Sequence, residues 1–371
     1  MNIVWCSWKD KKHPLAGGAE LVSENILRRL AAHGHQVTLL TSRAPGLPAR
    51  EDIDGYKVIR RGSRYTVHLH AMRYYKKHLR GWAGMVVDEI NTAPFFARFW
   101  AQTPNIIFIH QLARQVWFYE MPKPFSWIGY AIEPLYLRAL SKSPAITISN
   151  STKHDLERCD FQPDAISIIR EGITLTPVTD PAKIPKYDRP TVLALGALRP
   201  MKRTHHIVQA FTVARQHIPD LQLIIAGDTS DPYARVVMGE VASSPYQSDI
   251  TVLGRVSSEK KSELMQRSHL QAVASLKEGW GLTVTEANSQ GTPVVAYDVD
   301  GLRDSVQDGV TGIITAPNPT ALGDGIVALL DNKTTYERLR TAAWQDSKQY
   351  QFDTTYDDFV TAVRERLTIT L

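Results

Sequence analysis

Short apolar runs alternate with amphipathic stretches along most of the chain. Near the N-terminus, residues 2–8 are strand-like, apolar residues recur at helical spacing from Ala19 to Leu30, and residues 35–41 form the next apolar run. This βαβ pattern returns throughout the chain and predicts an α/β fold built on parallel strands. Further strands are expected at residues 57–60, 85–90, 105–109, 145–149, 166–169, 191–196, 221–227, 251–254, 270–276 and 293–297, with a turn and strand at 309–316.

A proline-rich polar stretch interrupts this alternation. Prolines recur from Pro177 to Pro190, and such a stretch is typical of an interdomain linker, here residues 176–190. A chain of 371 residues is also too long for one ordinary α/β core. We therefore expect two doubly wound, Rossmann-like parallel-sheet domains, residues 1–175 and residues 191–354, that face each other across a cleft.

Residues 274–295 are the most informative stretch, because they predict a strand, a glycine-rich turn, a short helix and a second strand. The backbone N–H groups of Gly281, Leu282 and Thr283 would point out of the helix N-terminus, where the helix dipole is positive. An anionic phosphate is the natural ligand of such a helix end. Gly279 and Gly281 have no Cβ, so a ligand can approach the main chain closely.

Two carboxylates flank this turn: Glu278 precedes the helix, and Glu286 lies about one turn inside it. A carboxylate can accept both protons of a vicinal diol, so one glutamate suits a ribose and the other a sugar ring. Phosphate, ribose and sugar together specify a nucleotide sugar. Either glutamate alone is also compatible with a helix cap or a solvated surface position. The two glutamates around Gly-x-Gly, with Gly-x-Pro-Val-Val downstream, are harder to explain in that way.

The stretch from Glu278 to Val295 resembles the signature of the retaining GT-B glycosyltransferases of family 4, E-G-x-G-L-x-x-x-E-A…G-x-P-V-V. The resemblance implies the GT-B fold and transfer, with retention, of a UDP- or GDP-linked sugar to an acceptor hydroxyl. The resemblance also implies that the reaction needs no metal ion or other cofactor. Glu278 would hold the donor sugar and Glu286 the ribose, and the last helix, residues 355–371, would complete the first domain. The acceptor stays open between a lipid-linked or cell-envelope glycan and a small molecule.

Other parts of the chain match the family's donor site. Residues 17–20 fit the G-G-x-E loop that lies against the diphosphate, and His110 follows a buried strand where the family has a histidine on the donor sugar. Lys202 matches the phosphate lysine of G-R-L-x-x-x-K, but Ala197 stands where the arginine is usual, so Arg199 is expected to replace it. The expected catalytic residues are His110, Glu278, Lys202 and Arg199, and the expected donor-binding residues are Gly17, Gly18, Arg255, Val256, Gly279, Trp280, Gly281, Leu282, Thr283 and Glu286.

Each of these matches has a simpler structural explanation. A lone histidine after a strand is more often structural, and cations in a loop are often only solvated. The Asp298-Val299-Asp300 sequence resembles a metal motif of the other glycosyltransferase fold, but three residues are weak evidence and we expect no metal there. No Walker A, Gly-x-Gly-x-x-Gly, His-Glu-x-x-His or Gly-x-Ser-x-Gly sequence occurs.

Composition and charge add expectations about location. Cys6 and Cys159 cannot form a disulfide framework, no signal peptide or long apolar span is evident, and a cytoplasmic protein is expected. The net charge is +5, and the segment 57–80 holds cations without a single acid. We expect an amphipathic helix there, with His68, Met72, Tyr75 and Leu79 on one face. The cations of this segment are Lys57, Arg60, Arg61, Arg64, Arg73, Lys76, Lys77 and Arg80.

The segment 57–80 could make a peripheral contact with the inner face of the membrane, or be only a solvated face. The aromatic segment 117–136 is compatible with sugar stacking, a membrane interface or a core. Three alternatives to the expected transferase are another GT-B enzyme, such as a phosphorylase or a sugar-nucleotide epimerase, a non-catalytic binding protein on the same scaffold, and a nucleic-acid binder. Nucleotide sugar, not nucleic acid, is the expected partner.

Overall fold

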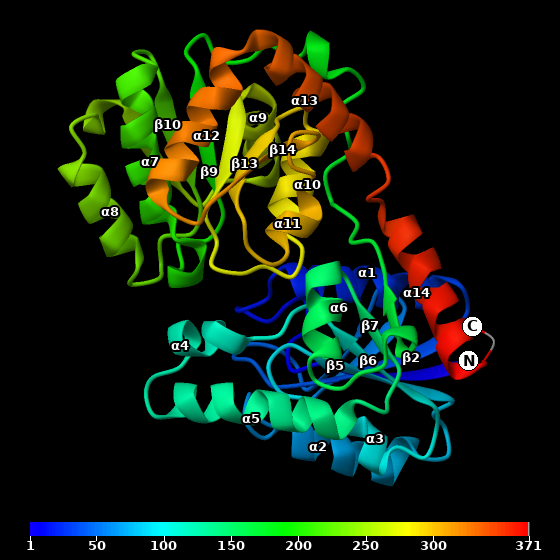
Figure 1. Cartoon of the computed structure of the whole chain (residues 1–371). Helices are drawn as coiled ribbons and strands as arrows, with labels where there is room; N and C mark the ends of the chain where they lie inside the picture. The colour runs from blue at the N-terminus through cyan, green and yellow to red at the C-terminus, as the bar shows by residue number, and fades with distance from the viewer. Residues whose placement is uncertain (370) are drawn as a thin grey trace. The chain divides into compact units, whose positions relative to one another are not determined.

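The computed structural model describes residues 1–369 and 371, apart from the side chain of Glu120. The chain divides into two compact units (Figure 1). Unit 1 consists of residues 1–172 and 351–371, and unit 2 of residues 173–350. Each unit is built on its own β-sheet with helices against it, which confirms the predicted pair of parallel-sheet α/β domains.

The sheet of unit 1 has the strand order β3-β4-β2-β1-β5-β6-β7-β8. Its neighbouring strands run parallel except for the β3–β4 pair, which is antiparallel. The central strands are apolar on both faces, as expected for a sheet covered by helices on both sides. The polar edge strand β3 was not predicted, because it has no apolar run. The strands are β1 Asn2–Cys6, β2 Gln36–Thr41, β3 Arg50–Ile53, β4 Tyr56–Arg60, β5 Met85–Ile90, β6 Asn105–Ile109, β7 Ala145–Thr147 and β8 Ile166–Ile168.

Helices cover both faces of this sheet. On one face the ring of Trp5 packs against Phe359 of the C-terminal helix, with 5.5 Å between ring centroids. On the other face Val4 and Val86 pack in one cluster with Tyr75. The helical segments are α1 Gly18–Ala32, α2 Val67–Tyr74, its π-helical continuation η1 Tyr75–Leu79, α3 Ala97–Trp100, η2 Arg114–Val116, α4 Trp117–Glu120, α5 Phe125–Leu140, α6 Asn150–Glu157, η3 Pro163–Ala165 and α14 Phe352–Leu367.

Helix α14 belongs to unit 1 although it follows all of unit 2 in sequence. Arg170 holds the carboxylate of Asp358 with two guanidinium nitrogens, at 2.8 and 2.9 Å. The amide of Gly172 donates to Thr355 Oγ1 at 2.9 Å. A Cβ on Gly172 would lie 2.6 Å from the backbone nitrogen of Phe352, so only glycine allows this close approach.

Unit 2 has a fully parallel sheet with the strand order β11-β10-β9-β12-β13-β14. The chain moves outward from β9 through β10 and β11, and then outward on the other side from β12 through β13 and β14. The loops after β9 and β12 therefore diverge, which makes a ligand crevice at the carboxyl ends of these two strands. The strands are β9 Thr191–Leu195, β10 Gln222–Ala226, β11 Ile250–Gly254, β12 Leu270–Val273, β13 Val294–Tyr297 and β14 Gly312–Thr315.

The helices of unit 2 pack around one large apolar cluster. Helix α7 and helix α12 lie against each other on the sheet, where a Cβ on Gly323 would meet the carbonyl of Ala210 at 2.8 Å. The helical segments are η4 Pro181–Lys183, η5 Pro200–Lys202, α7 Thr204–His217, α8 Ala234–Ser243, η6 Gln247–Asp249, α9 Ser258–Arg267, α10 Leu282–Ser289, α11 Leu302–Ser305, α12 Pro319–Asp331 and α13 Lys333–Ser347.

The proline-rich stretch 176–190 lies within unit 2. The ammonium group of Lys186 is buried and donates to three backbone carbonyls and to the hydroxyl of Thr292, at 2.8–2.9 Å. Burial and the nearby Arg340 lower the pKa of Lys186 well below its usual range. Trp344 Nε1 donates to the carbonyl of Val178 at 2.7 Å. These long-range contacts anchor a stretch whose composition is typical of a free linker.

The amphipathic helix of segment 57–80 packs on the sheet of unit 1. Its buried stripe is Val67, Ala71, Tyr75 and Leu79, at a strict spacing of four residues. Of the predicted face, Tyr75 and Leu79 are buried and Met72 is half-buried against the same cluster. In the first two turns the fully buried positions, Val67 and Ala71, lie one residue before the predicted His68 and Met72. The buried side chains lie with Val4, Cys6 and Val86 in one apolar cluster.

Arg60 is not part of a basic surface, although it falls in the basic segment. It is completely buried, and its Nε lies 2.7 Å from Asp10 Oδ2. Its NH1 lies 2.9 Å from Glu51 Oε2. Two carboxylates thus neutralise Arg60 inside unit 1, while the neighbouring Arg61 is exposed.

We expect Arg60→Met to destabilise the protein by about 3–5 kcal/mol, because the substitution leaves the buried Asp10 carboxylate without its partner. The matched exposed substitution, Arg61→Met, should change the free energy of unfolding by no more than about 0.5 kcal/mol. Denaturant unfolding followed by tryptophan fluorescence measures both. Equal stability of the two variants would contradict a structural role for the Arg60–Asp10 pair.

Candidate functional site

A pocket in unit 2 lies at the carboxyl ends of β9 and β12, where the strand order changes direction. Residues 194–196 at the end of β9 line one side, and residues 272–275 at the end of β12 line the other. Lys202, Thr204, Ile207, Glu278 and Thr283 complete the lining. Three residues predicted from the sequence therefore converge on one pocket: Lys202 from the segment after β9, and Glu278 and Thr283 from the segment after β12.

Lys202 and Glu278 form an ion pair at this pocket, with 2.5 Å between Lys202 Nζ and Glu278 Oε1. Ser275 Oγ donates to the same carboxylate oxygen at 2.5 Å. The two loops are also joined through the main chain, because the amide of Leu276 donates to the carbonyl of Met201 at 2.8 Å. The pair is partly exposed, 31% for the lysine side chain and 13% for the glutamate, so a ligand can reach both groups.

Helix α10 begins directly beside this pair. Gly281, with φ +96°, is its N-cap, and a Cβ there would lie 3.0 Å from the side chain of Leu302. As the first residues of the helix, Leu282 and Thr283 have N–H groups without partners inside it. Gly301, with φ +80°, lies so close to the carbonyl of Glu278 that a Cβ would collide with it. Glycine at these two positions lets the turn fold tightly around the pocket.

Gly279 and Trp280 occupy the turn between Glu278 and α10. The ring of Trp280 lies 5.3 Å from that of Tyr350, measured between centroids, and thereby closes one side of the turn. Among the described residues, the buried Trp280 Nε1 has no hydrogen-bond partner. The turn therefore offers one indole N–H in addition to the amides of the helix end.

Glu286 is buried inside the first turns of α10, with 4% of the residue exposed. Both of its carboxylate oxygens lie 2.7 Å from Lys261 Nζ on α9, and Thr174 Oγ1 donates at 3.3 Å. Lys261 was not singled out from the sequence, because no local pattern joins residues 25 positions apart. The ion pair thus fixes the orientation of the glutamate.

Arg199, Arg255 and Val256, which the sequence also predicted for the donor site, do not line this pocket. Arg199 is the N-cap residue of η5. Hydrogen bonds from Ser230 are the main cause that lowers the pKa of Asp228, and the positive charges of Arg255 and Arg199 lower it further. Arg255 is exposed and Val256 half-buried, immediately before α9. Arg199 and Arg255 thus contribute positive charge around Asp228, between β10 and the loop that carries Lys202.

In unit 1, the predicted glycine loop leads into α1. Gly17 is the N-cap and Gly18 the first residue of the helix. The carboxylate of Glu20 folds back, accepts the Gly17 amide at 2.7 Å and pairs with Lys9 at 3.1 Å. Because Glu20 occupies the Gly17 amide, the amides of the first helical turn, beginning with Gly18, are the donors that a ligand could meet at this helix start.

His110 lies in unit 1, after β6, and is buried between two glutamates. Its Nδ1 is 3.3 Å from Glu171 Oε1, and its Nε2 is 3.6 Å from Glu89 Oε1. Burial alone would lower the pKa of His110, but the hydrogen bond to Glu171 and the nearby carboxylate of Glu89 outweigh burial and raise it to about 9. His110 is therefore an imidazolium ion at neutral pH. In the sequence, Glu89 stands out only as one of two acids, with Asp88, in the apolar run of β5.

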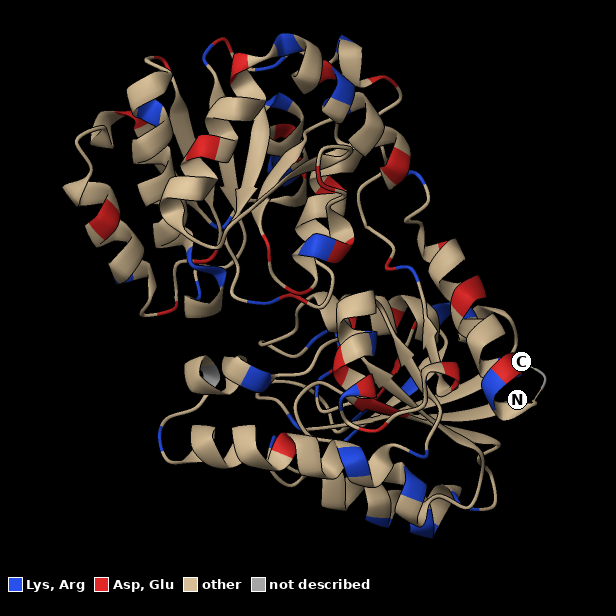
Figure 2. Cartoon of the chain, in the orientation of Figure 1, with Lys and Arg blue, Asp and Glu red and all other residues tan. Residues whose placement is uncertain are grey.

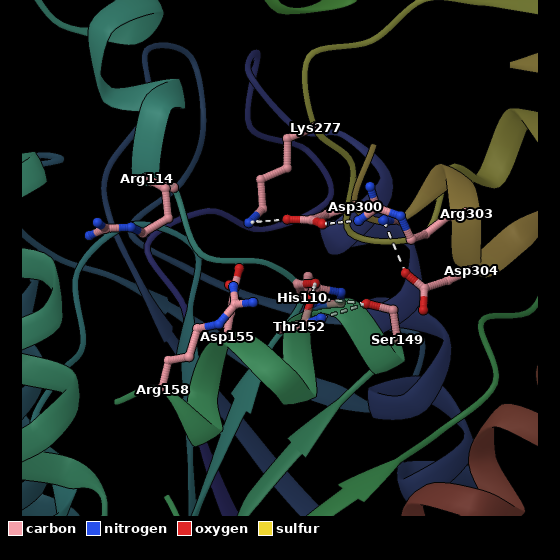
Figure 3. A network of polar contacts seen from close by, with 12 residues as sticks. His110, Arg114, Ser149, Thr152, Asp155, Arg158, Lys277, Asp300, Arg303 and Asp304 are labelled. Carbon is pink, nitrogen blue, oxygen red and sulfur yellow. Dashed lines mark hydrogen bonds and ion pairs between the residues drawn. The ribbon is translucent and has the colours of Figure 1, made fainter. Parts of the chain in front are cut away.

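Helix α6 also contacts His110. Thr152 Oγ1 donates to the carbonyl of His110 at 3.1 Å, and Ser149 Oγ accepts the amide of Thr152 at 3.2 Å (Figure 3). Ser149 is thus the N-cap of α6.

Both aspartates of the Asp298-Val299-Asp300 sequence form ion pairs with Arg303. Arg303 Nε lies 2.8 Å from Asp298 Oδ1 and Arg303 NH1 lies 2.5 Å from Asp300 Oδ1. Asp300 also pairs with Lys277 at 3.0 Å (Figure 3). Burial would raise the pKa of Asp300, but these two cations together lower it. Both carboxylates therefore have cationic side chains of the same unit as partners.

Two family models match the chain. The model described as Glycosyltransferase Family 4 matches residues 16–176, and the model described as Glycosyl transferases group 1 matches residues 179–346. The phosphatidyl-myo-inositol mannosyltransferase of Mycobacterium tuberculosis is 29% identical over 198 residues, which are 51% of this chain and 51% of that protein. The matched region spans about half the length of this curated relative.

Solved structures with the same fold cover nearly the whole chain. Sucrose-phosphate synthase from Thermosynechococcus elongatus superposes with a TM-score of 0.79 at 20% identity, over 98% of both chains. Anabaena HepE, solved in complex with UDP and glucose, superposes with a TM-score of 0.73 at 18% identity, over 98% of this chain and all of that one. Together with the two family models, these likenesses place the chain in the family 4, group 1 glycosyltransferases, with their GT-B fold of two parallel-sheet α/β domains.

Proposed function

We propose that this glycosyltransferase moves a sugar from a UDP- or GDP-linked donor to an acceptor hydroxyl, with retention at the anomeric carbon. The observation that carries the proposal is the Lys202–Glu278 pair, which lies at the strand switch point beside the free end of α10. A lysine, a carboxylate and a helix N-terminus meet there within one pocket. These are the groups that a diphosphate bonded to a sugar requires.

The chemistry gives each group a role. When the bond between the anomeric carbon and the diphosphate oxygen breaks, negative charge grows on the diphosphate and positive charge grows on the sugar. Lys202, Arg199 and the amides at the start of α10 would stabilise the diphosphate as it leaves. Glu278 would accept hydrogen bonds from the sugar hydroxyls, once the diphosphate takes over Lys202.

The other predicted contacts would complete the donor site. Glu286, which Lys261 holds in place, would accept both hydroxyls of the ribose. The backbone beside Arg255 and Val256 would hold the base, and the Gly18 amide of unit 1 would donate to the diphosphate. His110, an imidazolium ion, would donate to the donor sugar or the leaving phosphate.

The acceptor is proposed to be a lipid-linked or cell-envelope glycan. The name of the mycobacterial relative, which acts on a phosphatidyl-inositol, supports this choice. The reaction is proposed to need no metal ion, and the pairing of Asp298 and Asp300 with Arg303 supports that part. Among the described residues, no helix has the length and apolarity to cross a membrane.

We expect Glu286→Ala to weaken the binding of UDP or GDP by about tenfold to a hundredfold, because two hydrogen bonds from the ribose lose their charged acceptor. Isothermal titration with each nucleotide measures the change. Glu263→Gln, on the exposed side of α9, is the matched control and should bind like the unmodified protein. Equal affinity of Glu286→Ala and the control would remove Glu286 from the ribose site.

We expect Lys202→Ala to lower turnover by about 10²–10³ while the fold is retained, because one donor to the leaving diphosphate is lost. Release of UDP or GDP from a panel including UDP-glucose and GDP-mannose measures turnover. Lys333→Ala, at the exposed start of α13, controls for the loss of a surface charge. Near-normal turnover with an unchanged melting temperature would exclude Lys202 from the phosphate site.

We expect the charge of His110 to make stability fall between about pH 6.5 and about pH 9. The pKa of His110 is higher in the folded protein than in the unfolded chain. Protonation of His110 therefore stabilises the fold fully below the pKa of the unfolded chain, and this stabilisation is lost as the pH approaches about 9. The loss should be on the order of a few kcal/mol. Calorimetric melting should show a steeper decline for the unmodified protein than for His110→Gln. Parallel declines would mean that His110 is neutral.

A further inference from the structure

Helix α5 of unit 1 presents a broad apolar face to solvent. Its outward side chains are large, and about half of each is exposed: 58% for Phe125, 57% for Trp127, 48% for Ile128, 47% for Ile132 and 61% for Leu135. These positions share one side of the helix at about 100° per residue. We call these five residues the α5 face. A contiguous exposed patch of this kind usually marks an interaction surface.

The opposite side of α5 already supplies the core. Leu137 and Leu140 are fully buried in an apolar cluster of unit 1. Glu133, the one acid in α5, is also buried, and accepts the amides of Ala113 and Arg114 at 2.7 Å each. The helix is thus fixed from its inner side, and the α5 face is an additional apolar surface beyond what folding of unit 1 requires.

The short helix α4 extends the α5 face at its N-terminal end. The ring of Phe118 lies 4.9 Å from that of Trp127 and 5.2 Å from that of Tyr130. A Cβ on Gly129 would lie 2.5 Å from the ring of Trp117, so α4 packs directly on α5. The two helices present their aromatic rings together.

Basic helices flank the α5 face on the same side of the sheet. Helix α3 links α5 to η1, because the Phe96 and Tyr136 rings lie 6.4 Å apart and the Tyr75 and Trp100 rings 5.0 Å apart. Phe99 of α3 is 62% exposed. Figure 2 shows lysine and arginine over α2 and its continuation, below α5. The exposed cations of these flanks are Arg73, Lys76, Lys77, Arg80, Lys123 and Lys142.

We propose that the α5 face docks unit 1 on an anionic phospholipid surface. The helix lies parallel to the membrane plane, with Trp127 and Phe125 at the headgroup level and the aliphatic side chains in the upper acyl region. The lysines of η1 and of the α5 ends contact lipid phosphates from the flanks. An apolar face with basic flanks is the pattern of an interfacial helix.

Charge favours lipid over a second copy of this chain. A twofold dimer through the α5 face would place the same basic flanks of both copies near each other, where like charges repel within a Debye length of about 8–10 Å. An anionic bilayer instead attracts every cation of the flanks. A fluid lipid surface also accommodates a convex helix without a matching groove.

The lipid surface goes beyond the proposed transfer reaction. The sequence had left membrane contact open for the basic segment 57–80 and for the aromatic segment 117–136. The structure assigns the apolar contact to the α5 face, within the aromatic segment, and leaves the basic segment as one flank. A lipid-linked acceptor would be reached more readily from a protein that lies on the same surface. Docking does not depend on the donor site, so either proposal can fail alone.

Co-sedimentation of the full chain with vesicles tests the docking. We expect binding to vesicles that contain about one third phosphatidylglycerol, and weaker binding to pure phosphatidylcholine or at high salt. Ile132→Glu/Leu135→Glu should reduce binding tenfold or more, and Lys76→Glu/Lys77→Glu by a smaller factor. Val236→Glu/Met238→Glu, on an equally exposed pair in unit 2, is the control and should bind normally.

Melting temperature and the shift caused by UDP or GDP verify that each variant is folded and that unit 2 works. Failure of the unmodified protein to sediment with phosphatidylglycerol vesicles would overturn the docking. Equal binding by Ile132→Glu/Leu135→Glu would also overturn it. A dimer in the absence of lipid that the same substitutions abolish would assign the α5 face to a second copy instead. A nucleotide shift that survives in any of these cases would leave the proposed reaction intact.

Discussion

The site depends on one geometric constraint, the divergence of two loops from adjacent parallel strands. Because β9 and β12 are neighbours from which the chain departs in opposite directions, the loops after them separate and leave a pocket. Lys202 enters this pocket from one loop and Glu278 from the other, and they meet at 2.5 Å. The ion pair thus forms at the place where the strand order of the sheet changes direction.

Two glycines allow the backbone beside the pocket to pack closely against its neighbours. Gly281 and Gly301 both have positive φ angles, and both lie against neighbours that leave little or no room for a Cβ. A side chain at either position would move the turn that carries Glu278 and the first amides of α10. Farther along α10, Lys261 fixes Glu286 from a different helix. The candidate site is therefore held by backbone conformation at one glutamate and by an ion pair at the other.

Local patterns predicted much of this protein. The apolar runs marked most strands, and the two-glutamate motif marked the turn and helix that line the pocket, because these signals depend on neighbouring residues. The family resemblance was confirmed by the two matching models. What the sequence could not supply were contacts between distant residues: Lys261 with Glu286, Glu89 and Glu171 around His110, and Asp10 with Arg60. The segment 57–80 illustrates this limit, since its Arg60 is buried and pairs with Asp10, 50 residues away in the sequence.

The most direct test is a crystal structure of the protein soaked with UDP or GDP. The central claim is that the switch point of unit 2 binds the diphosphate of a nucleotide sugar. We predict phosphate oxygens at the N-terminus of α10 and at Lys202, with the ribose hydroxyls on Glu286. Phosphates bound elsewhere, with the Lys202–Glu278 pair left intact, would contradict the claim.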